Sequence, residues 1–119
     1  MSLNKAMLIG RVGQDLELKS PSESSKVVNF SIATNSYWTD KASGNKVEKT
    51  EWHRCVAWNK TAELCSKYLH KGKECYIEGE IRHREYDDKD GIKRYVTEIV
   101  VNTVQFFGSS RDNSSPENK

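Results

Sequence analysis

Residues 50–58 concentrate side chains that bind flat, negatively charged ligands. The segment reads Thr-Glu-Trp-His-Arg-Cys-Val-Ala-Trp, and in an extended chain successive side chains point to opposite faces. Two indoles and a guanidinium on one surface predict stacking on planar bases and neutralisation of phosphates. That surface carries Trp52, Arg54, Val56 and Trp58. The opposite face carries His53, Cys55 and Ala57, which are small enough to line a tight barrel.

The end of a second extended segment, residues 73–86, repeats this arrangement. Arg82, Arg84 and Tyr86 alternate with other residues and therefore share one face. If the two segments border one groove, they supply it with three cations and three aromatic rings. Because every base has a π-face, such a groove predicts binding of unpaired nucleic acid without regard to sequence.

Trp38 is a further candidate for base stacking. It stands near Lys41 and Lys46 in a polar stretch, residues 36–49, which we expect to form a long loop. An indole at the mouth of such a loop has no obvious core to enter. The alternative is that it packs back onto the body of the protein.

A structural interpretation competes with the binding interpretation for the other rings as well. Trp52 and Trp58 could be core residues, since large aromatic side chains dominate many small cores. Arg82 and Arg84 could form a solvated face with weak ion pairs. The shared face with Arg54 favours binding, because an unpaired guanidinium is seldom buried.

The surrounding pattern predicts an all-β fold that positions these segments. Residues 27–34 alternate apolar with small or polar side chains, as a half-buried strand does. With residues 3–12, 50–58, 73–86 and 92–104 they make five strands, and residues 61–70 have the spacing of a helix. Five strands with one helix between the third and fourth predict an OB-fold barrel.

Caps and turns support these boundaries. Asn59 or Thr61 is placed to cap the start of the helix, and Gly72 is placed to end it in the left-handed conformation. Asp90-Gly91 predicts a hairpin turn between the last two strands.

Length and composition indicate one domain and a disordered tail. We assign residues 1–107 to the OB-fold domain and residues 108–119, which lack bulky apolar side chains, to the tail. The net charge of +2 does not by itself predict nucleic acid as the partner. No run approaches the roughly 18 apolar residues of a membrane span, and no secretion signal is visible, so we expect a cytoplasmic protein.

The sequence contains no recognisable motif for catalysis or for binding a metal or a cofactor. Cys55, Cys65 and Cys75 lie ten residues apart, without the close Cys-x-x-Cys pairing of zinc sites, and we expect each to be a buried hydrophobic residue. No phosphate-cradling glycine loop or nucleophile elbow is present. We therefore predict a binding protein rather than an enzyme.

Three blocks of residues, in order, resemble the bacterial single-stranded DNA-binding protein family. They are Asn4-Lys5 with the apolar run up to Gly13-Gln14-Asp15, then Thr50-Glu51-Trp52-His53-Arg54, then Tyr76-Ile77-Glu78-Gly79. The resemblance extends from about residue 4 to residue 107. It implies an OB fold assembled as a homotetramer that binds and protects single-stranded DNA during replication, recombination and repair, with a location at the nucleoid.

The resemblance also implies roles for individual residues. It places Trp38, Trp52, Trp58 and Tyr86 at the family's base-stacking positions. It places Lys41, Arg54, Lys60, Lys71 and Arg84 along the DNA path, to which the pattern of alternation adds Arg82. His53 and Tyr76 match positions near subunit contacts.

This sequence departs from the family pattern at two places. Glu85 stands where members can carry a lysine, so one phosphate contact is expected to be missing or replaced. Members generally end in an acidic tip that recruits replication and repair enzymes, and this sequence stops at Lys119 without one. We therefore expect such partners only if the full-length protein carries that tip.

Two other functions remain open at this stage. The aromatic face could dock a peptide or a subunit, in which case affinity would not fall linearly with the logarithm of salt. Binding of RNA, or the role of a primosome-associated relative, is the other alternative. Competition between matched DNA and RNA oligomers distinguishes the nucleic acids, because only RNA carries the 2′-hydroxyl.

Overall fold

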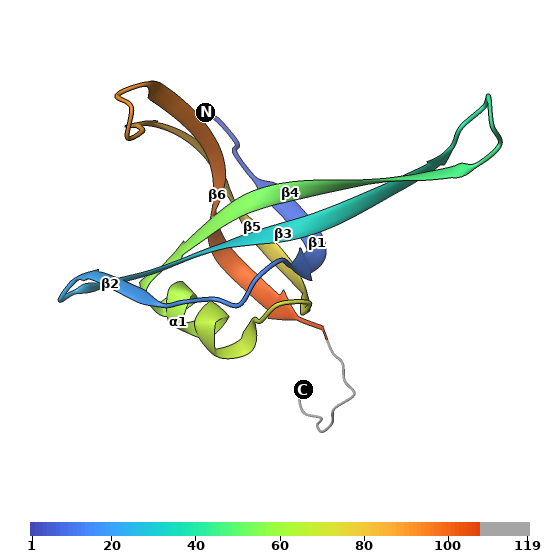
Figure 1. Ribbon diagram of the computed structural model, residues 1–119. Helices are drawn as coiled ribbons and strands as arrows, with labels where there is room; N and C mark the ends of the chain where they lie inside the picture. The colour runs from blue at the N-terminus through green and yellow to red at the C-terminus, as the bar shows by residue number, and fades with distance from the viewer. Residues whose placement is uncertain (108–119) are drawn as a thin grey trace.

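The computed structural model describes residues 1–107, so the expected tail of residues 108–119 lies outside the described residues. Strands dominate it (Figure 1). In chain order the elements are β1 (Ala6–Val12), β2 (Lys19–Ser22), β3 (Ser25–Thr39), β4 (Lys46–Trp58), α1 (Asn59–Tyr68), β5 (Glu74–Asp87) and β6 (Lys93–Phe106).

Five of the strands close into a barrel. The sheet order is β1-β5-β6-β4-β3-β2, and β1 pairs again with β3, so the ring returns to its start. All pairings are antiparallel except β4 with β6, where Cys55 lies opposite Ile99. With α1 inserted before β5, this is the OB-fold architecture that the sequence predicts. The short β2 was not predicted, because its four residues are all exposed and carry no alternation.

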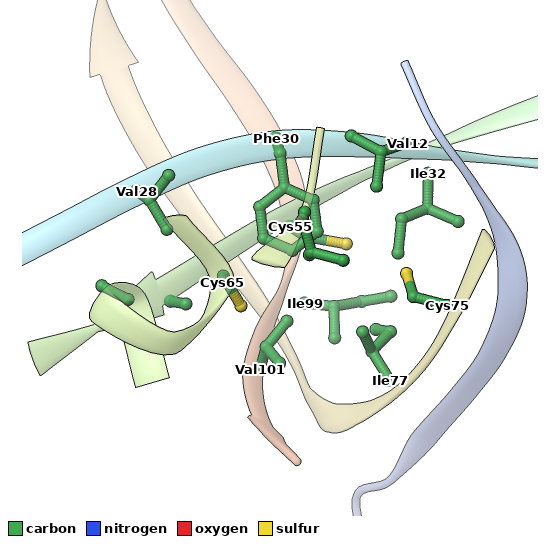
Figure 2. Close-up of a cluster of buried hydrophobic side chains, with 13 residues drawn as sticks. Val12, Val28, Phe30, Ile32, Cys55, Cys65, Cys75, Ile77, Ile99 and Val101 are labelled. Carbon is green, nitrogen blue, oxygen red and sulfur yellow. The ribbon is translucent and has the colours of Figure 1, made fainter. Parts of the chain in front are cut away.

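The interior of the barrel is filled by side chains from alternate strand positions and from α1 and its C-terminal end (Figure 2). The buried cluster comprises Val12, Val28, Phe30, Ile32, Cys55, Ala57, Ala62, Cys65, Leu69, Cys75, Ile77, Ile99 and Val101. The three cysteines are buried, as predicted. Burial among apolar neighbours raises the pKa of Cys55 to about 12, that of Cys65 to about 12 and that of Cys75 to about 11. These thiols therefore act as core side chains.

The predicted long loop over residues 36–49 is wrong. The β3–β4 pairing continues to Thr39 opposite Lys46, so only residues 40–45 form the connection. The two strands project from the barrel as a long arm, the β3–β4 arm (Figure 1). Because both faces of the outer arm meet solvent, its sequence lacks the apolar alternation that marks a half-buried strand.

The helix ends also differ from the prediction. Neither Asn59 nor Thr61 caps α1: the N-cap position is Trp58, and no side chain caps it. The Asn59 side-chain oxygen instead accepts a hydrogen bond from the backbone N–H of Lys26, 3.0 Å away. Gly72 is left-handed as expected, with φ of 87°, but it lies in the turn before β5, since α1 already ends at Tyr68. In residues 1–107, α1 is the only helix and does not have the length and apolarity to cross a membrane.

Candidate nucleic-acid interface

The outer face of β4 exposes its rings. Trp52 is 60% exposed and Trp58 is 45% exposed, and Arg54 between them is also exposed. The interpretation of these two indoles as core residues is therefore wrong. Val56 on the same face is buried; at this residue β4 pairs with β3 at Asn29 and with β6 at Val100.

A hollow of about 550 Å³ lies where β4 meets the β5–β6 hairpin and the inner face of β1. It brings together Trp52, Arg54 and Tyr86, three of the predicted site residues. Its remaining lining is Ala6, Leu8, His53, Ile81, Tyr95, Val96, Thr97, Glu98 and Ile99. Rings, a cation and an apolar floor give this hollow the chemistry to hold a base beside a phosphate.

Tyr95 is a candidate that the sequence analysis missed. It is 72% exposed, lines the hollow with Tyr86 and lies opposite Glu85 on the neighbouring strand. The sequence feature that indicates Tyr95 is an aromatic ring next to Arg94 in β6. The alternation of rings with arginines along residues 50–58 and 73–86 does not include Tyr95, which lies on a third strand.

The other predicted stacking residues lie away from this hollow. Trp38 is 49% exposed on the β3–β4 arm, opposite Val47, whereas Trp52 lies opposite Ala33. Five residues of strand separate these two pairs, or about 17 Å at 3.3 Å per residue. Trp58, six residues from Trp52, lies at the far end of β4 next to α1. The three indoles therefore form a spaced series along β3 and β4 and not one cluster.

The arginines of the β5–β6 hairpin already have carboxylate partners. Arg82 pairs with Glu80 at 3.0 Å, and Arg84 Nε donates to Glu98 at 2.8 Å. The hydrogen bond and charge of Glu98 raise the pKa of Arg84 above its ordinary value. The Arg84 guanidinium also lies 5.9 Å from the centre of the Tyr86 ring. A phosphate approaching either arginine would have to compete with a carboxylate.

The remaining predicted cations are differently placed. Lys41 lies in the turn of the β3–β4 arm, Lys60 in the first turn of α1, and Lys71 in the turn before β5. Within residues 1–107, these three lysines and Arg54 make no salt bridge. Their charges are free to attract phosphates.

The two predicted subunit-contact residues lie on different sides of the barrel. His53 lines the hollow, and its Nε2 lies 2.8 Å from the hydroxyl of Thr34. Tyr76 lies on the outer face of β5, where its hydroxyl donates a hydrogen bond to Glu78. That bond lowers the pKa of Glu78, with a further contribution from Lys5, and raises the pKa of Tyr76.

Comparison with known proteins gives one consistent result. The sequence model of the single-strand binding protein family matches residues 3–107. Single-stranded DNA-binding protein 1 of Chlorobaculum tepidum is 50% identical over 108 residues, which cover 90% of this chain and 66% of that protein. Single-stranded DNA-binding protein 1 of Xylella fastidiosa is 44% identical over 117 residues, covering 98% of this chain and 86% of that protein. The chain thus spans just under two thirds of the length of the first relative.

A solved structure shares the fold. The Plasmodium falciparum SSB complex with ssDNA matches with a TM-score of 0.81 at 35% sequence identity. The match covers 91% of this chain and 97% of that chain.

Proposed function

This chain belongs to the single-strand binding protein family, and we propose that it binds and protects single-stranded DNA without regard to sequence. Protection during replication, recombination and repair, at the nucleoid, is part of this proposal. The activity is equilibrium binding, with no covalent step assigned to any residue.

The proposed mechanism combines stacking with charge neutralisation. Trp38, Trp52, Trp58 and Tyr86 stack on bases, and a well-placed ring contributes about 1–3 kcal/mol to such a contact. Lys41, Arg54, Lys60 and Lys71 neutralise phosphates and release counterions, and Arg82 and Arg84 contribute less because each is already paired with a carboxylate. Tyr95 joins the stacking residues because it lines the same hollow as Trp52 and Tyr86.

One observation carries this proposal. Trp52 is more than half exposed on the rim of a hollow that it shares with Arg54, which makes no ion pair within residues 1–107. Exposing an indole to water forgoes burial of apolar area at about 25 cal/mol per Å². A ligand that covers the ring recovers this free energy, and the adjacent cation favours a ligand that is an anion.

The proposal is tested by titrating the protein with long oligo-dT at two salt concentrations. We expect strong quenching of tryptophan emission and an affinity that falls linearly with the logarithm of salt. Unchanged emission at low salt would contradict single-stranded DNA binding. Affinity without salt dependence would instead support a peptide or subunit as the ligand. A matched RNA oligomer serves as the competitor that separates the two nucleic acids.

We further propose that the protein assembles as a homotetramer through the outer face of β1 and β5. Met7 and Ile9 are exposed there, and the strand register places them opposite Glu78 and Tyr76. Lys5 lies 3.2 Å from Glu78 on the same face. On its other side β1 pairs with β3 only at Arg11 and Val12, which leaves the start of the strand as an open edge.

Light scattering on the purified protein tests this assembly. We expect the mass of four chains, and dissociation in Met7→Glu combined with Ile9→Lys, because two charges would then replace apolar contacts. A wild-type monomer at micromolar concentration would contradict the assembly. His53 is proposed as a further subunit contact, and recruitment of replication and repair proteins is proposed only for a full-length protein with an acidic tip.

A further inference from the structure

The short segment Gly13-Gln14-Asp15 contacts the proposed binding face at two points. It follows β1 directly. A Cβ at residue 13 would lie 2.5 Å from Cζ3 of Trp52, 3.2 Å from Cη2 and 3.4 Å from Cε3. Because real contacts of this kind are longer, the six-membered ring of Trp52 occupies space that only a glycine leaves open.

Asp15 makes the second contact. Its Oδ1 accepts a hydrogen bond from the backbone N–H of Lys71 at 3.0 Å, across 56 residues of sequence. Two residues of chain span at most about 7 Å, so the contacts to Trp52 and Lys71 are made from almost the same place. The segment therefore joins a proposed stacking residue to a proposed phosphate-binding residue.

The segment is itself anchored to the barrel. The backbone N–H of Gly13 donates to the carbonyl of Ser31 at 2.9 Å, and Oε1 of Gln14 accepts from the backbone N–H of Ser31 at 3.3 Å. Ser31 belongs to β3 and lies opposite Arg54 of β4. A loop fixed to β3 in this way can hold the Trp52 side chain of β4 and the backbone of the turn before β5.

We infer that Gly13-Gln14-Asp15 is a positioning loop that fixes the Trp52 ring and the backbone of Lys71 for single-stranded DNA. This inference rests on the proposed function and deepens it. Gly13 sets the ring position through the absence of a side chain, and Asp15 sets the turn that carries Lys71. Neither residue needs to touch DNA.

A double-mutant cycle tests the glycine. Gly13→Ala pushes the Trp52 ring from its place, and we expect affinity for oligo-dT to fall about fivefold or more, as partial loss of one stacking contact would cause. Trp52→Phe lacks Cζ3 and Cη2, the two atoms nearest to the added methyl group. In that background Gly13→Ala should cause less than a twofold further loss. An equal loss in both backgrounds, or no loss in either, would overturn the inference.

A spectroscopic measurement on the free protein separates this inference from the proposed function. In a Trp38→Phe, Trp58→Phe background, Trp52 is the sole tryptophan. Gly13→Ala should shift its emission and change its quenching by acrylamide, even if the protein bound no DNA at all. Unchanged emission would contradict the positioning role.

Thermal unfolding of each variant shows whether a loss of affinity comes from unfolding of the protein or from displacement of the Trp52 ring. If Gly13→Ala unfolds the protein and Trp52→Phe rescues it, the contact between the two residues is established. If Gly13→Ala unfolds both backgrounds equally, the glycine is needed by the backbone and the inference fails for it.

The aspartate has its own conservative control. Asp15→Asn keeps a side-chain oxygen that accepts from Lys71 N–H, whereas Asp15→Ala removes it. We expect Asp15→Ala to weaken oligo-dT binding two- to fivefold and Asp15→Asn to restore it. In a Lys71→Ala background, Asp15→Ala should have no further effect. Additive losses would show that Asp15 acts without Lys71.

Discussion

The β3–β4 arm and the β5–β6 hairpin both project from the barrel in Figure 1 and both carry aromatic rings beside cations, yet their charges are arranged differently. Within residues 1–107, the hairpin contains four ion pairs, Arg82–Glu80, Arg84–Glu98, Lys93–Glu85 and Arg94–Asp88. Strands β3 and β4, whose outer part forms the arm, contain one ion pair between them, Lys49–Glu51. Arg54, at the base of the arm, and Lys41, at its tip, have no carboxylate partner within residues 1–107.

This difference distinguishes cations that are free to bind phosphate from cations that are already paired. The amino-acid composition of the two regions does not distinguish them. At the base of the arm, a phosphate would meet the free guanidinium of Arg54, and binding there would release counterions. On the hairpin, a phosphate must displace a carboxylate, and the net gain in charge neutralisation is small. Glu85 adds to this effect, because one of its carboxylate oxygens lies 3.3 Å from Nζ of Lys93 and already pairs with that cation. We therefore expect the arm to supply most of the affinity and of the salt dependence.

Removing one ring from each region tests this expectation most directly. Trp52→Ala should weaken oligo-dT binding by about 1–3 kcal/mol, or roughly 5- to 150-fold. Tyr86→Ala should cost about 1 kcal/mol or less, because its ring is smaller and Arg84 already lies over it. Fluorescence titrations with oligo-dT measure both losses.

Two controls make this comparison decisive. Trp52→Phe keeps an aromatic plane and should recover most of the lost affinity. Thermal unfolding of Trp52→Ala should stay close to wild type, since the side chain is largely exposed. A larger loss for Tyr86→Ala than for Trp52→Ala would reverse the order proposed for the two regions.

Salt dependence tests the charges of the two regions. Arg54→Met should reduce the slope of log K against log salt by about 0.7, the value for one phosphate contact on a single strand. Arg84→Met should change the slope by less than about 0.3, because Glu98 already neutralises that guanidinium. Titrations at four or more salt concentrations give the slopes.

Glu98→Gln sharpens the same test. It releases Arg84 from its partner, so we expect a steeper slope and tighter binding at low salt than in the wild type. The double variant Arg84→Met, Glu98→Gln should return the slope to the wild-type value. If Arg54→Met and Arg84→Met gave the same slope, the ion pairs of the hairpin would be irrelevant to DNA binding.

The sequence predicted the barrel because its buried strands alternate regularly. Val28, Phe30 and Ile32 are all buried, as the period of two required. It failed on the β3–β4 arm, where Tyr37 and Trp38 pair across to β4 with both faces in solvent. In that part of the chain, apolar and polar residues do not alternate, so the pattern does not indicate a strand. Only the high β propensity of Tyr37 and Trp38 indicates one.

The candidate site was predictable in part for a related reason. The alternation along residues 50–58 was enough to predict that Trp52 and Arg54 share an outer face, since this alternation depends only on local backbone geometry. The ion pair of Arg84 with Glu98, the place of Tyr95 and the contact of Gly13 with Trp52 all depend on how separate segments meet. Such contacts follow from strand register, which a single sequence does not specify.

The tips of the two regions allow the finest comparison, because an aspartate holds each turn. On the arm, Asp40 Oδ2 accepts from the hydroxyl and the backbone N–H of Ser43, at 2.8 and 3.0 Å. Those hydrogen bonds lower the pKa of Asp40, with the hydroxyl as the largest cause. On the hairpin, the side chain of Arg94 is the largest cause that lowers the pKa of Asp88, followed by backbone N–H groups.

The sign of the pH dependence follows from these shifts. Because each pKa is lowered in the folded turn, the stabilisation is complete above the ordinary value of about 3.9 and is lost as the pH falls through the lowered value.

Salt should affect the pKa values of the two aspartates differently. It screens the ion pair of Asp88 with Arg94, so the pKa of Asp88 should rise toward its ordinary value in 1 M NaCl. The pKa of Asp40 should rise less, since its partner Ser43 carries no charge. Carboxyl titration by NMR at low and high salt measures both, and Asp88→Asn controls the assignment. Equal responses to salt would mean that the cation next to Asp88 does not set its pKa, and that the two tips are held by the same kind of bond.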